Sequence, residues 1–524
     1  MRLLHRASIL PALCLALLIG TSATVAQPGS AVDLRPVEDP LFGVSSVVPQ
    51  DWQDLGSGVH ARGTPPEDMA LIAIQSAQAT PDQLWPALLP QFAIDQIPEV
   101  TGSLEGEHFD WTLYQFNVTL GELALSVELA LAEDDGSTHL VLLQSDPDEF
   151  SILREQVFLP AVEDFDVLAP EPTPDPATLG YPVEEVIFAG GSQDVELAGT
   201  LTVPPGPGPH PAVILMSGSG AQDRDESMRP VTTLKPFALL ADALTSAGVA
   251  VLRYDDRGVG GSSGDYAAAT IDDLAGDGHA ALDYLRGRAD IDPARIGLLG
   301  HSEGGLYAAQ LAAADPDIAF VVGMAAPAVD GVSLIVAQNE AIQRSQGVSD
   351  EQIAAARAAA EASMPAARDG DEAALEASLR GYFGELWDQS TADDRTILGD
   401  REPFIDRQVE GLKDRYLSDW FRSFLAYDPA PDWQQVGVPV LGLFGAKDVQ
   451  VVTEQNEPAL RAALEAGGNE AVEIVVFPDA NHLFQSAQTG AVEEYSTLAA
   501  EFTPDFLPTV VEWVVRQAGV ADEG

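Results

Sequence analysis

Apolar runs that alternate with helical patterns from Val183 onward constrain the fold more than any other feature of this sequence. A strand buried on both faces carries a continuous apolar run, and strands that alternate with helices pair in parallel. The pattern therefore predicts an α/β domain over residues 183–519, with a mostly parallel sheet covered by helices on both faces. The predicted strands lie in "HPAVILMS", "GVAVLRYD", "RIGLLGHS", "IAFVVGMAA", "PVLGLFGAKD" and "VEIVVFPD".

The third of these runs leads directly into "GHSEGG", and a small-residue helical pattern follows. A Gly-x-Ser-x-Gly sequence at a strand-to-helix turn is typical of a nucleophile elbow, because the glycines let the turn close while the hydroxyl stays accessible. We therefore expect Ser302 to be a catalytic nucleophile. A simple glycine turn without catalytic function is the alternative.

A serine nucleophile needs a base that removes its proton and an acid that orients the base. In the α/β hydrolases, whose elbow this motif resembles, the acid and then the histidine follow the serine along the chain. His482 is the only histidine after Ser302, and it follows the last apolar strand run in "FPDANHLF". We therefore expect His482 to be the base, with a surface loop histidine as the alternative.

The acid should follow the preceding strand run, and Asp448 in "VLGLFGAKDVQV" has this position. Its carboxylate would accept the Nδ1–H of His482 and stabilise the imidazolium. Asp428 and Asp479 are the alternatives.

The oxyanion of the tetrahedral intermediate needs two backbone N–H donors. One is expected directly after the nucleophile and the other in the loop after an earlier strand of the sheet. The loop "LMSGSGAQDRDE" has small residues that permit close backbone approach. We expect the N–H groups of Ser219 and Glu303 to be the donors, and a hairpin turn is the alternative for the loop.

Residues 332–425 form an interval between two strand runs that is too long for a simple crossover, which predicts an inserted helical cap. Aromatic side chains at helical spacing in this interval would line an acyl or alcohol pocket above Ser302, or form the core of the cap itself. These residues are Tyr382, Phe383, Trp387, Trp420, Phe421 and Phe424.

The N-terminal third reads as a small α+β domain over residues 33–167 without an evident catalytic cluster, and its start, "GVSSVVPQDW", resembles the PsbP/Mog1-like sandwich domains. A proline-rich stretch over residues 168–182 predicts an extended linker to the α/β domain. The predicted strands are "FGVSSVVP", "MALIAIQSA", "WTLYQFNVTL" and "LALSVELALAE", and the predicted helices are "PDQLWPALLPQF" and "DEFSILREQVFLPAVEDF".

Residues 1–26 have the order of a secretory signal peptide: basic residues, the apolar run "ILPALCLALLIG" and small residues that end at "ATVA". The apolar run is short for a bilayer crossing. We therefore expect a secreted or periplasmic protein without stable membrane insertion after cleavage; an uncleaved anchor is the alternative.

The formal net charge of −56 excludes nucleic acid as a plausible partner, and the spread of carboxylates with only three lysines resembles salt-adapted proteins.

Cys14, inside the signal segment, is the only cysteine, so catalysis by a thiol is not expected. The glycines of "YDDRGVGGSSGD" lack the Gly-Lys-Ser/Thr ending of a phosphate loop, which favours a structural loop. No metal motif occurs in the sequence, and no cofactor or metal is expected.

Six segments in this order resemble the EstD-like carboxylesterases, which are α/β hydrolases related to the serine aminopeptidase and dienelactone hydrolase groups. The resemblance implies Ser302 as nucleophile, Asp448 as acid and His482 as base. Many relatives have histidine where this chain has Ser217. The segments are "GSGAQDRDE", "YDDRGVGGSSGD", "GLLGHSEGG", "FLAYDPAPDW", "PVLGLFGAKDVQV" and "NHLFQSAQTGAVEEY".

The sequence thus predicts a secreted serine carboxylic ester hydrolase that acts on a small-molecule ester through an acyl-enzyme on Ser302. A serine peptidase, an aminopeptidase or an acyltransferase with the same triad is the first alternative. A non-catalytic binding protein that retains the fold is the second.

Overall fold

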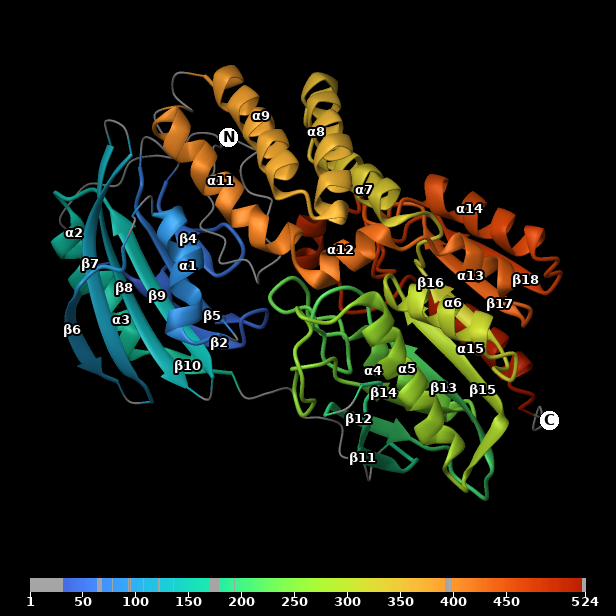
Figure 1. Cartoon of the computed structure of the whole chain (residues 1–524). Coiled ribbons are helices and arrows are strands. Elements are labelled where there is room, and N and C mark those ends of the chain that lie inside the picture. Colours follow the sequence, from blue (N-terminus) through green and yellow to red (C-terminus); the bar gives the residue numbers. More distant parts are fainter. Residues whose placement is uncertain are drawn as a thin grey trace.

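The computed structural model describes residues 32–520 except 64–67, 78, 93, 95, 107, 121–122, 135, 169–178, 193, 392–394 and 396–397. The predicted signal segment and most of the predicted linker lie outside the described residues. Figure 1 shows two antiparallel sheets in the N-terminal part and a larger sheet with helices in the remainder.

The N-terminal part contains a seven-stranded antiparallel sheet in the order β3-β4-β5-β9-β8-β7-β6 and a three-stranded sheet in the order β1-β2-β10. The strands are β1 (Leu34–Asp39), β2 (Val44–Pro49), β3 (Gln53–Asp54), β4 (Val59–Ala61), β5 (Leu71–Ala77), β6 (Val100–Glu105), β7 (Asp110–Leu120), β8 (Leu123–Asp134), β9 (Ser137–Ser145) and β10 (Asp166–Val167). The four strands predicted for this part are present, but the prediction was incomplete, because β9 lies between β5 and β8 inside the sheet.

Both faces of the seven-stranded sheet are covered. Side chains alternate across a strand, so Val141 and Leu143 of β9 pack on one face and Leu140 and Leu142 on the other. The first face is covered by the continuous helical segment α2 (Phe150–Leu153), η1 (Arg154–Phe158) and α3 (Leu159–Glu163), and the second by α1 (Pro81–Gln91).

The larger sheet has eight strands in the order β11-β12-β14-β13-β15-β16-β17-β18. The pairs from β14 to β18 are parallel, whereas β11 and β12 are antiparallel to their neighbours. Each of the six predicted runs forms one of the parallel strands, so the predicted mostly parallel sheet is confirmed. The strands are β11 (Val183–Ala189), β12 (Glu196–Thr202), β13 (His210–Met216), β14 (Ala250–Tyr254), β15 (Ile291–His301), β16 (Val321–Met324), β17 (Val440–Gly445) and β18 (Val472–Phe477).

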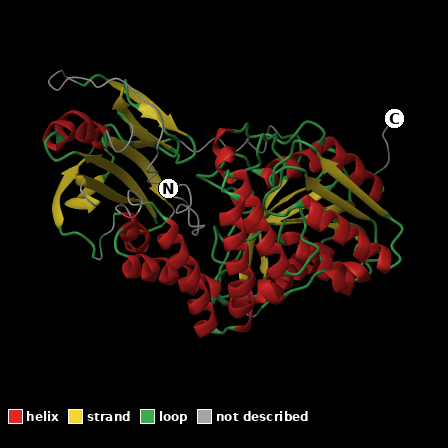
Figure 2. Cartoon of the chain, turned by 90° about the horizontal axis from the view of Figure 1, so that it is seen from above, coloured by secondary structure: helices red, strands yellow, loops and turns green. Residues whose placement is uncertain are grey.

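Helices flank the strands of this sheet (Figure 2). In one layer α4 packs against α15, and in another α5, α6, α13 and α14 pack in sequence against one another. Their bounds are α4 (Pro236–Ser246), α5 (Ile271–Arg286), α6 (Gly304–Ala314), α13 (Ala430–Gln435), α14 (Thr453–Ala466) and α15 (Phe506–Gln517), with a 3₁₀ turn η2 (Val492–Thr497) before α15. None of the described helices combines the length and apolar character that a bilayer crossing needs.

Between β16 and β17 the chain forms a group of helices, α7 to α12, which is the predicted cap (Figure 1). Ser349 caps the start of α8 by accepting the Gln352 N–H, and Gly370 ends the helix at a φ of 70°. Helix α8 packs against α7 and α9, and α12 contacts α7, α8 and α5. The helices are α7 (Gly331–Ser345), α8 (Asp350–Asp369), α9 (Glu372–Gln389), α11 (Arg401–Tyr416) and α12 (Asp419–Ala426).

Candidate active site

Ser302 stands at the sharp turn between β15, which ends at His301, and α6, which begins at Gly304. Its φ is 51°, in the left-handed region that non-glycine residues rarely adopt. The Ser302 N–H donates to the Met324 carbonyl at 2.8 Å, and this bond anchors the turn to the neighbouring strand. A strained residue held in this way is typical of a nucleophile elbow.

The glycines on either side of Ser302 are required by close backbone contacts. A Cβ atom at Gly300 would lie 2.1 Å from the Gly304 carbonyl oxygen, and one at Gly304 would lie 2.1 Å from the Met216 carbonyl oxygen. No side chain fits at either position. Gly300 is thus required by a contact within the elbow, and Gly304 by the packing of the elbow against β13.

His482 and Asp448 come from the loops after β18 and β17, and the structure brings them together. His482 Nδ1 lies 2.8 Å from Asp448 Oδ2, and both side chains are buried. Asp448 Oδ1 accepts the N–H groups of Gln450 and Val451 at 2.7 and 2.9 Å, which leaves Oδ2 for the histidine. A carboxylate at Nδ1 favours the tautomer whose Nε2 is free to take a proton.

The other two candidate acids lie elsewhere. Asp428 is exposed and accepts the Ala430 N–H at 3.1 Å, and Asp479 is exposed and pairs with Lys447 at 3.3 Å. His482 Nδ1 is therefore paired with Asp448 and not with either of these two carboxylates.

His301, the residue before Ser302, lies beside His482, the expected base. The ring of His301 lies 4.7 Å from the ring of His482, measured between centroids. Its Nε2 also lies 3.1 Å from the His482 carbonyl oxygen. The end of β15 and the loop that carries His482 are therefore side by side.

The loop after β13 lies against the elbow, because a Cβ atom at Gly218 would be 3.2 Å from the Ser302 Cβ. The Gly218 N–H donates to Glu226 Oε1 at 2.8 Å and the Gly220 N–H donates to the Tyr266 hydroxyl at 2.9 Å. Among the residues that the structure describes, neither the intervening Ser219 N–H nor the Glu303 N–H has an acceptor. Two free N–H groups beside the nucleophile fit the requirement for oxyanion donors.

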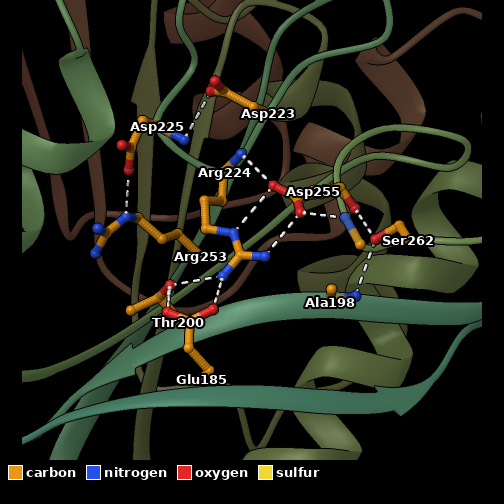
Figure 3. A network of polar contacts seen from close by, with 10 residues as sticks. Glu185, Ala198, Thr200, Asp223, Arg224, Asp225, Arg253, Asp255 and Ser262 are labelled. Carbon is orange, nitrogen blue, oxygen red and sulfur yellow. Dashed lines mark hydrogen bonds and ion pairs between the residues drawn. The ribbon is translucent and has the colours of Figure 1, made fainter. Parts of the chain in front are cut away.

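An ion-pair network braces the same loop (Figure 3). The Arg224 guanidinium donates from Nε and Nη2 to the two Asp255 carboxylate oxygens at 3.0 and 2.7 Å, and Asp255 Oδ1 also accepts the Arg224 backbone N–H at 2.9 Å. Nη1 of Arg224 donates to Thr200 at 2.7 Å and to Glu185. A bidentate pair of this kind restricts orientation as well as distance, so the network holds the loop against β12.

The glycine-rich loop over residues 254–265 is structural, as expected from its sequence. It supplies Asp255 to the network and Asp256 to Ser217, whose hydroxyl lies 3.1 Å from both Asp256 oxygens. Burial raises the pKa of Asp256 well above its ordinary value. Ser217 thus connects the loop after β13 to this buried carboxyl group.

The model of one family, described as the alpha/beta hydrolase family, matches residues 213–494, which is more than half of the chain. The chain belongs to the alpha/beta hydrolase family. The matched residues include Ser302, Asp448 and His482, together with the loop after β13.

Curated relatives extend the comparison. The chain is 26% identical to Esterase EstD of Thermotoga maritima over 324 residues, which cover 61% of this chain and 66% of the relative. It is 36% identical to the putative hydrolase YtaP of Bacillus subtilis over 146 residues, covering 25% of this chain and 48% of the relative. The chain thus spans less than two thirds of the length of these relatives.

Two solved structures are similar to part of the chain at low identity. The esterase Pf2001 of Pyrococcus furiosus is 16% identical, with a TM-score of 0.40 over 68% of this chain and 97% of that chain. Est1E of Butyrivibrio proteoclasticus with ferulic acid bound is 18% identical, with a TM-score of 0.38 over 64% of this chain and 99% of that chain.

The side chain of Glu303, whose backbone N–H is one of the expected oxyanion donors, is buried beside Ser302. Its Oε1 accepts the Tyr266 hydroxyl at 3.2 Å, the Trp420 indole N–H at 3.0 Å and the Tyr307 hydroxyl. Its Oε2 is buried without a hydrogen-bond partner. Burial raises the pKa of Glu303 above its ordinary value, although the three donors oppose this effect.

Of the two roles expected for the aromatic residues of the cap, packing in its core is the one that the contacts show. Phe383 packs edge-on against Phe404, and Phe421 stacks on Tyr416 at 5.1 Å, so these side chains belong to the core of the cap. Trp420 is half-buried and hydrogen-bonds to Glu303, which places it beside the elbow.

Sequence reasoning missed Glu226 and His301, although both stand inside quoted motifs. His301 precedes the nucleophile in "GHSEGG", and Glu226 closes "GSGAQDRDE". The charged residues directly after the small residues of the oxyanion loop were the available signal. In the part of the chain that the structure describes, no group of three or more His, Cys, Asp or Glu side chains is arranged to hold a metal ion.

Proposed function

We propose that this hydrolase cleaves carboxylic esters through an acyl-enzyme on Ser302. The observation that carries the proposal is the 2.8 Å contact between His482 Nδ1 and Asp448 Oδ2 on loops beside the strained elbow of Ser302. The similarity to Esterase EstD supports ester cleavage as the reaction.

In the proposed first step, Ser302 Oγ attacks the ester carbonyl carbon while His482 Nε2 takes the hydroxyl proton. The carbonyl oxygen becomes an oxyanion, which accepts hydrogen bonds from the N–H groups of Ser219 and Glu303. A donor of this type contributes about 10²–10³-fold to kcat. Asp448 stabilises the imidazolium of His482 through Nδ1–H.

When the tetrahedral intermediate collapses, the bond to the alcohol oxygen breaks and His482 returns the proton to the leaving alcohol. Water then attacks the acyl group on Ser302 with His482 again as the base. The carboxylic acid leaves, and the Ser302 hydroxyl is restored. These steps use only side chains and backbone groups of this chain, with a small-molecule ester and water as reactants.

We also propose that the protein is exported. The basic, apolar and small-residue segments of residues 1–26 support a cleaved secretory signal, and the excess of carboxylates supports function at high ionic strength.

The test is hydrolysis of p-nitrophenyl acetate, butyrate and octanoate by the purified chain at low and high salt. Turnover should disappear in Ser302→Ala and persist in Ser496→Ala, a matched change at an exposed serine outside the site. Cleavage of aminoacyl p-nitroanilides without cleavage of esters would assign a peptidase instead, and a folded protein without turnover on either substrate would support a binding role.

A further inference from the structure

We propose that Glu226 and His301 form a buried positioning pair. The pair fixes the position of the oxyanion loop, residues 217–235 between β13 and α4, relative to the loop that carries His482. The proposal rests on the proposed function, because it assigns these residues a role in the same reaction. Neither residue contacts the reacting atoms in this role, since both act through backbone groups of other residues.

Glu226 connects the oxyanion loop to β15, the strand that ends at His301. Its Oε1 accepts the Gly218 N–H at 2.8 Å and lies 2.7 Å from His301 Nδ1. The side chains of Glu226 and His301 are 1% and 3% exposed, so water does not compete for these contacts. Gly218 is the residue before Ser219. Because the Gly218 N–H is fixed by Glu226, the orientation of the Ser219 N–H is restricted as well.

His301 connects the elbow strand to the loop of the base. Its Nε2 lies 3.1 Å from the His482 carbonyl oxygen. A carbonyl oxygen only accepts hydrogen bonds, so Nε2 carries a proton. Nδ1 faces the carboxylate of Glu226 and donates to it, which makes the pair an imidazolium and a carboxylate.

The charges support this protonation state. Burial by itself lowers the pKa of His301, but the charge and hydrogen bond of Glu226 outweigh burial and raise the pKa above its ordinary value. The pair is neutral overall, which reduces the cost of burying both groups, whereas removal of either partner leaves the other buried and unpaired.

The backbone conformation at Glu226 directs its carboxylate toward Gly218 and His301. Glu226 has a φ of 56°, in the left-handed region, and its N–H donates to the Asp223 carbonyl at 2.9 Å. Asp223 Oδ1 in turn accepts the N–H groups of Asp225 and Ser227 at 3.0 and 2.9 Å. The tight turn directs the carboxylate of Glu226 back toward Gly218. Strain maintained by surrounding bonds is typical of functional sites.

The consequence for the reaction is specific. Loss of the pair releases both the loop of the oxyanion donor Ser219 and the loop of the base His482, while the cap remains in place. Small displacements of reacting groups lower kcat by about 10²-fold. We therefore expect Glu226→Ala and His301→Ala to lower kcat by about 10²-fold, with KM changed by less than about threefold, since transition-state contacts are lost and ground-state contacts retained.

The kinetic test measures kcat and KM for p-nitrophenyl butyrate. It compares the alanine and glutamine variants of Glu226 and of His301 with the double alanine variant. Glu226→Gln and His301→Gln should recover part of kcat, because each amide retains one of the hydrogen bonds. The double alanine variant should be no slower than the slower single variant, because the two residues act as one unit. His279→Gln, at an exposed histidine that pairs with Asp283 on α5, is the matched control and should retain kcat.

Thermal melting of each variant establishes that it is folded, and the glutamine variants keep the test valid if the alanine variants unfold. Unchanged kcat in the folded single variants would overturn the proposal, as would losses that multiply in the double variant.

Proton NMR tests the pair without turnover. The His301 Nδ1–H should give a far-downfield resonance that disappears in Glu226→Gln and persists in Asp448→Asn, which removes the carboxylate from His482 instead. Persistence of the same resonance in Glu226→Gln would reject the pair. If the wild type cleaves no ester, the proposed function fails while this measurement still decides whether the pair exists. If the wild type cleaves esters and the variants match it, only the positioning role fails.

Discussion

The indole N–H of Trp420, on the cap helix α12, donates to Glu303 Oε1 at 3.0 Å, so the cap is hydrogen-bonded to the residue that follows the nucleophile. The same carboxylate oxygen accepts the hydroxyl of Tyr266, and Tyr266 accepts the N–H of Gly220 from the oxyanion loop. The position of the cap is therefore linked to both sides of the candidate oxyanion hole.

Replacement of Trp420 by phenylalanine should weaken this link. The smaller ring retains contact with Phe424, whose ring stacks on Trp420 at 5.9 Å, but it has no N–H for Glu303. An intramolecular hydrogen bond contributes about 0.5–1.5 kcal/mol, so we expect Trp420→Phe to lower the free energy of unfolding in urea by about 1 kcal/mol. Trp387→Phe is the matched control, since its indole donates to the Gly399 carbonyl at an exposed site. Equal losses in both variants would contradict a special role for Trp420.

Replacement of Asp448 by asparagine should separate its role from those of the other candidate acids. An amide at this position no longer enforces the Nδ1–H tautomer of His482, so kcat on p-nitrophenyl butyrate should fall by about 10³–10⁴-fold. Asp428→Asn changes an exposed carboxylate of the same type and should leave kcat unaltered. A comparable loss in Asp428→Asn, with activity retained in Asp448→Asn, would reassign the acid.

The parallel strands and the elbow were predictable because their signals are local. A strand such as β17 is buried on both faces, so its whole length is apolar, and Ser302 stands in a short motif whose glycines mark the sharp turn. The positions of Asp448 and His482 follow from the same logic, since loops after parallel strands meet at one edge of the sheet.

The contacts that support these residues were not predictable, because they join distant parts of the chain. Glu226 meets His301 across 75 residues, and Trp420 meets Glu303 across 117. Nothing in the sequence near Glu226 indicates its partner, and its left-handed backbone is unusual for glutamate. Such pairs are specified by packing in three dimensions, which periodicity and spacing do not report.

Gly218 tests how closely the oxyanion loop must approach the elbow. A methyl group at this position would lie 3.2 Å from the Ser302 Cβ and 3.3 Å from Glu226 Oε1, distances that require small shifts of both neighbours. Gly218→Ala should therefore lower kcat by about ten- to a hundredfold with a smaller change in stability. Gly381→Ala, on an open face of α9, is the control and should leave kcat unchanged. Full activity in Gly218→Ala would show that the loop does not need this approach.

Glu303 gives a prediction for the pH dependence of stability. Because burial raises its pKa, the folded protein holds the proton of Glu303 more tightly than the unfolded chain, whose value is about 4.5. The stability that this proton contributes is complete below that value and is lost as the pH rises through the higher folded pKa. Glu303→Gln has no such proton, so the free energy of unfolding of wild type minus variant should decrease as the pH rises from 5 to 8.

Urea unfolding of wild type and Glu303→Gln across this pH range measures the difference between their free energies of unfolding. Ionisable groups that both proteins share cancel in this difference, except where their ionisation depends on Glu303. The exposed Glu465 provides a matched change, and the difference for Glu465→Gln should stay flat with pH. A wild-type advantage that grows with pH would mean that the three donors at Oε1 outweigh burial and that Glu303 is more acidic in the folded protein. In that case the cap would be held by a stable carboxylate, and Trp420→Phe should become more destabilising as the pH rises.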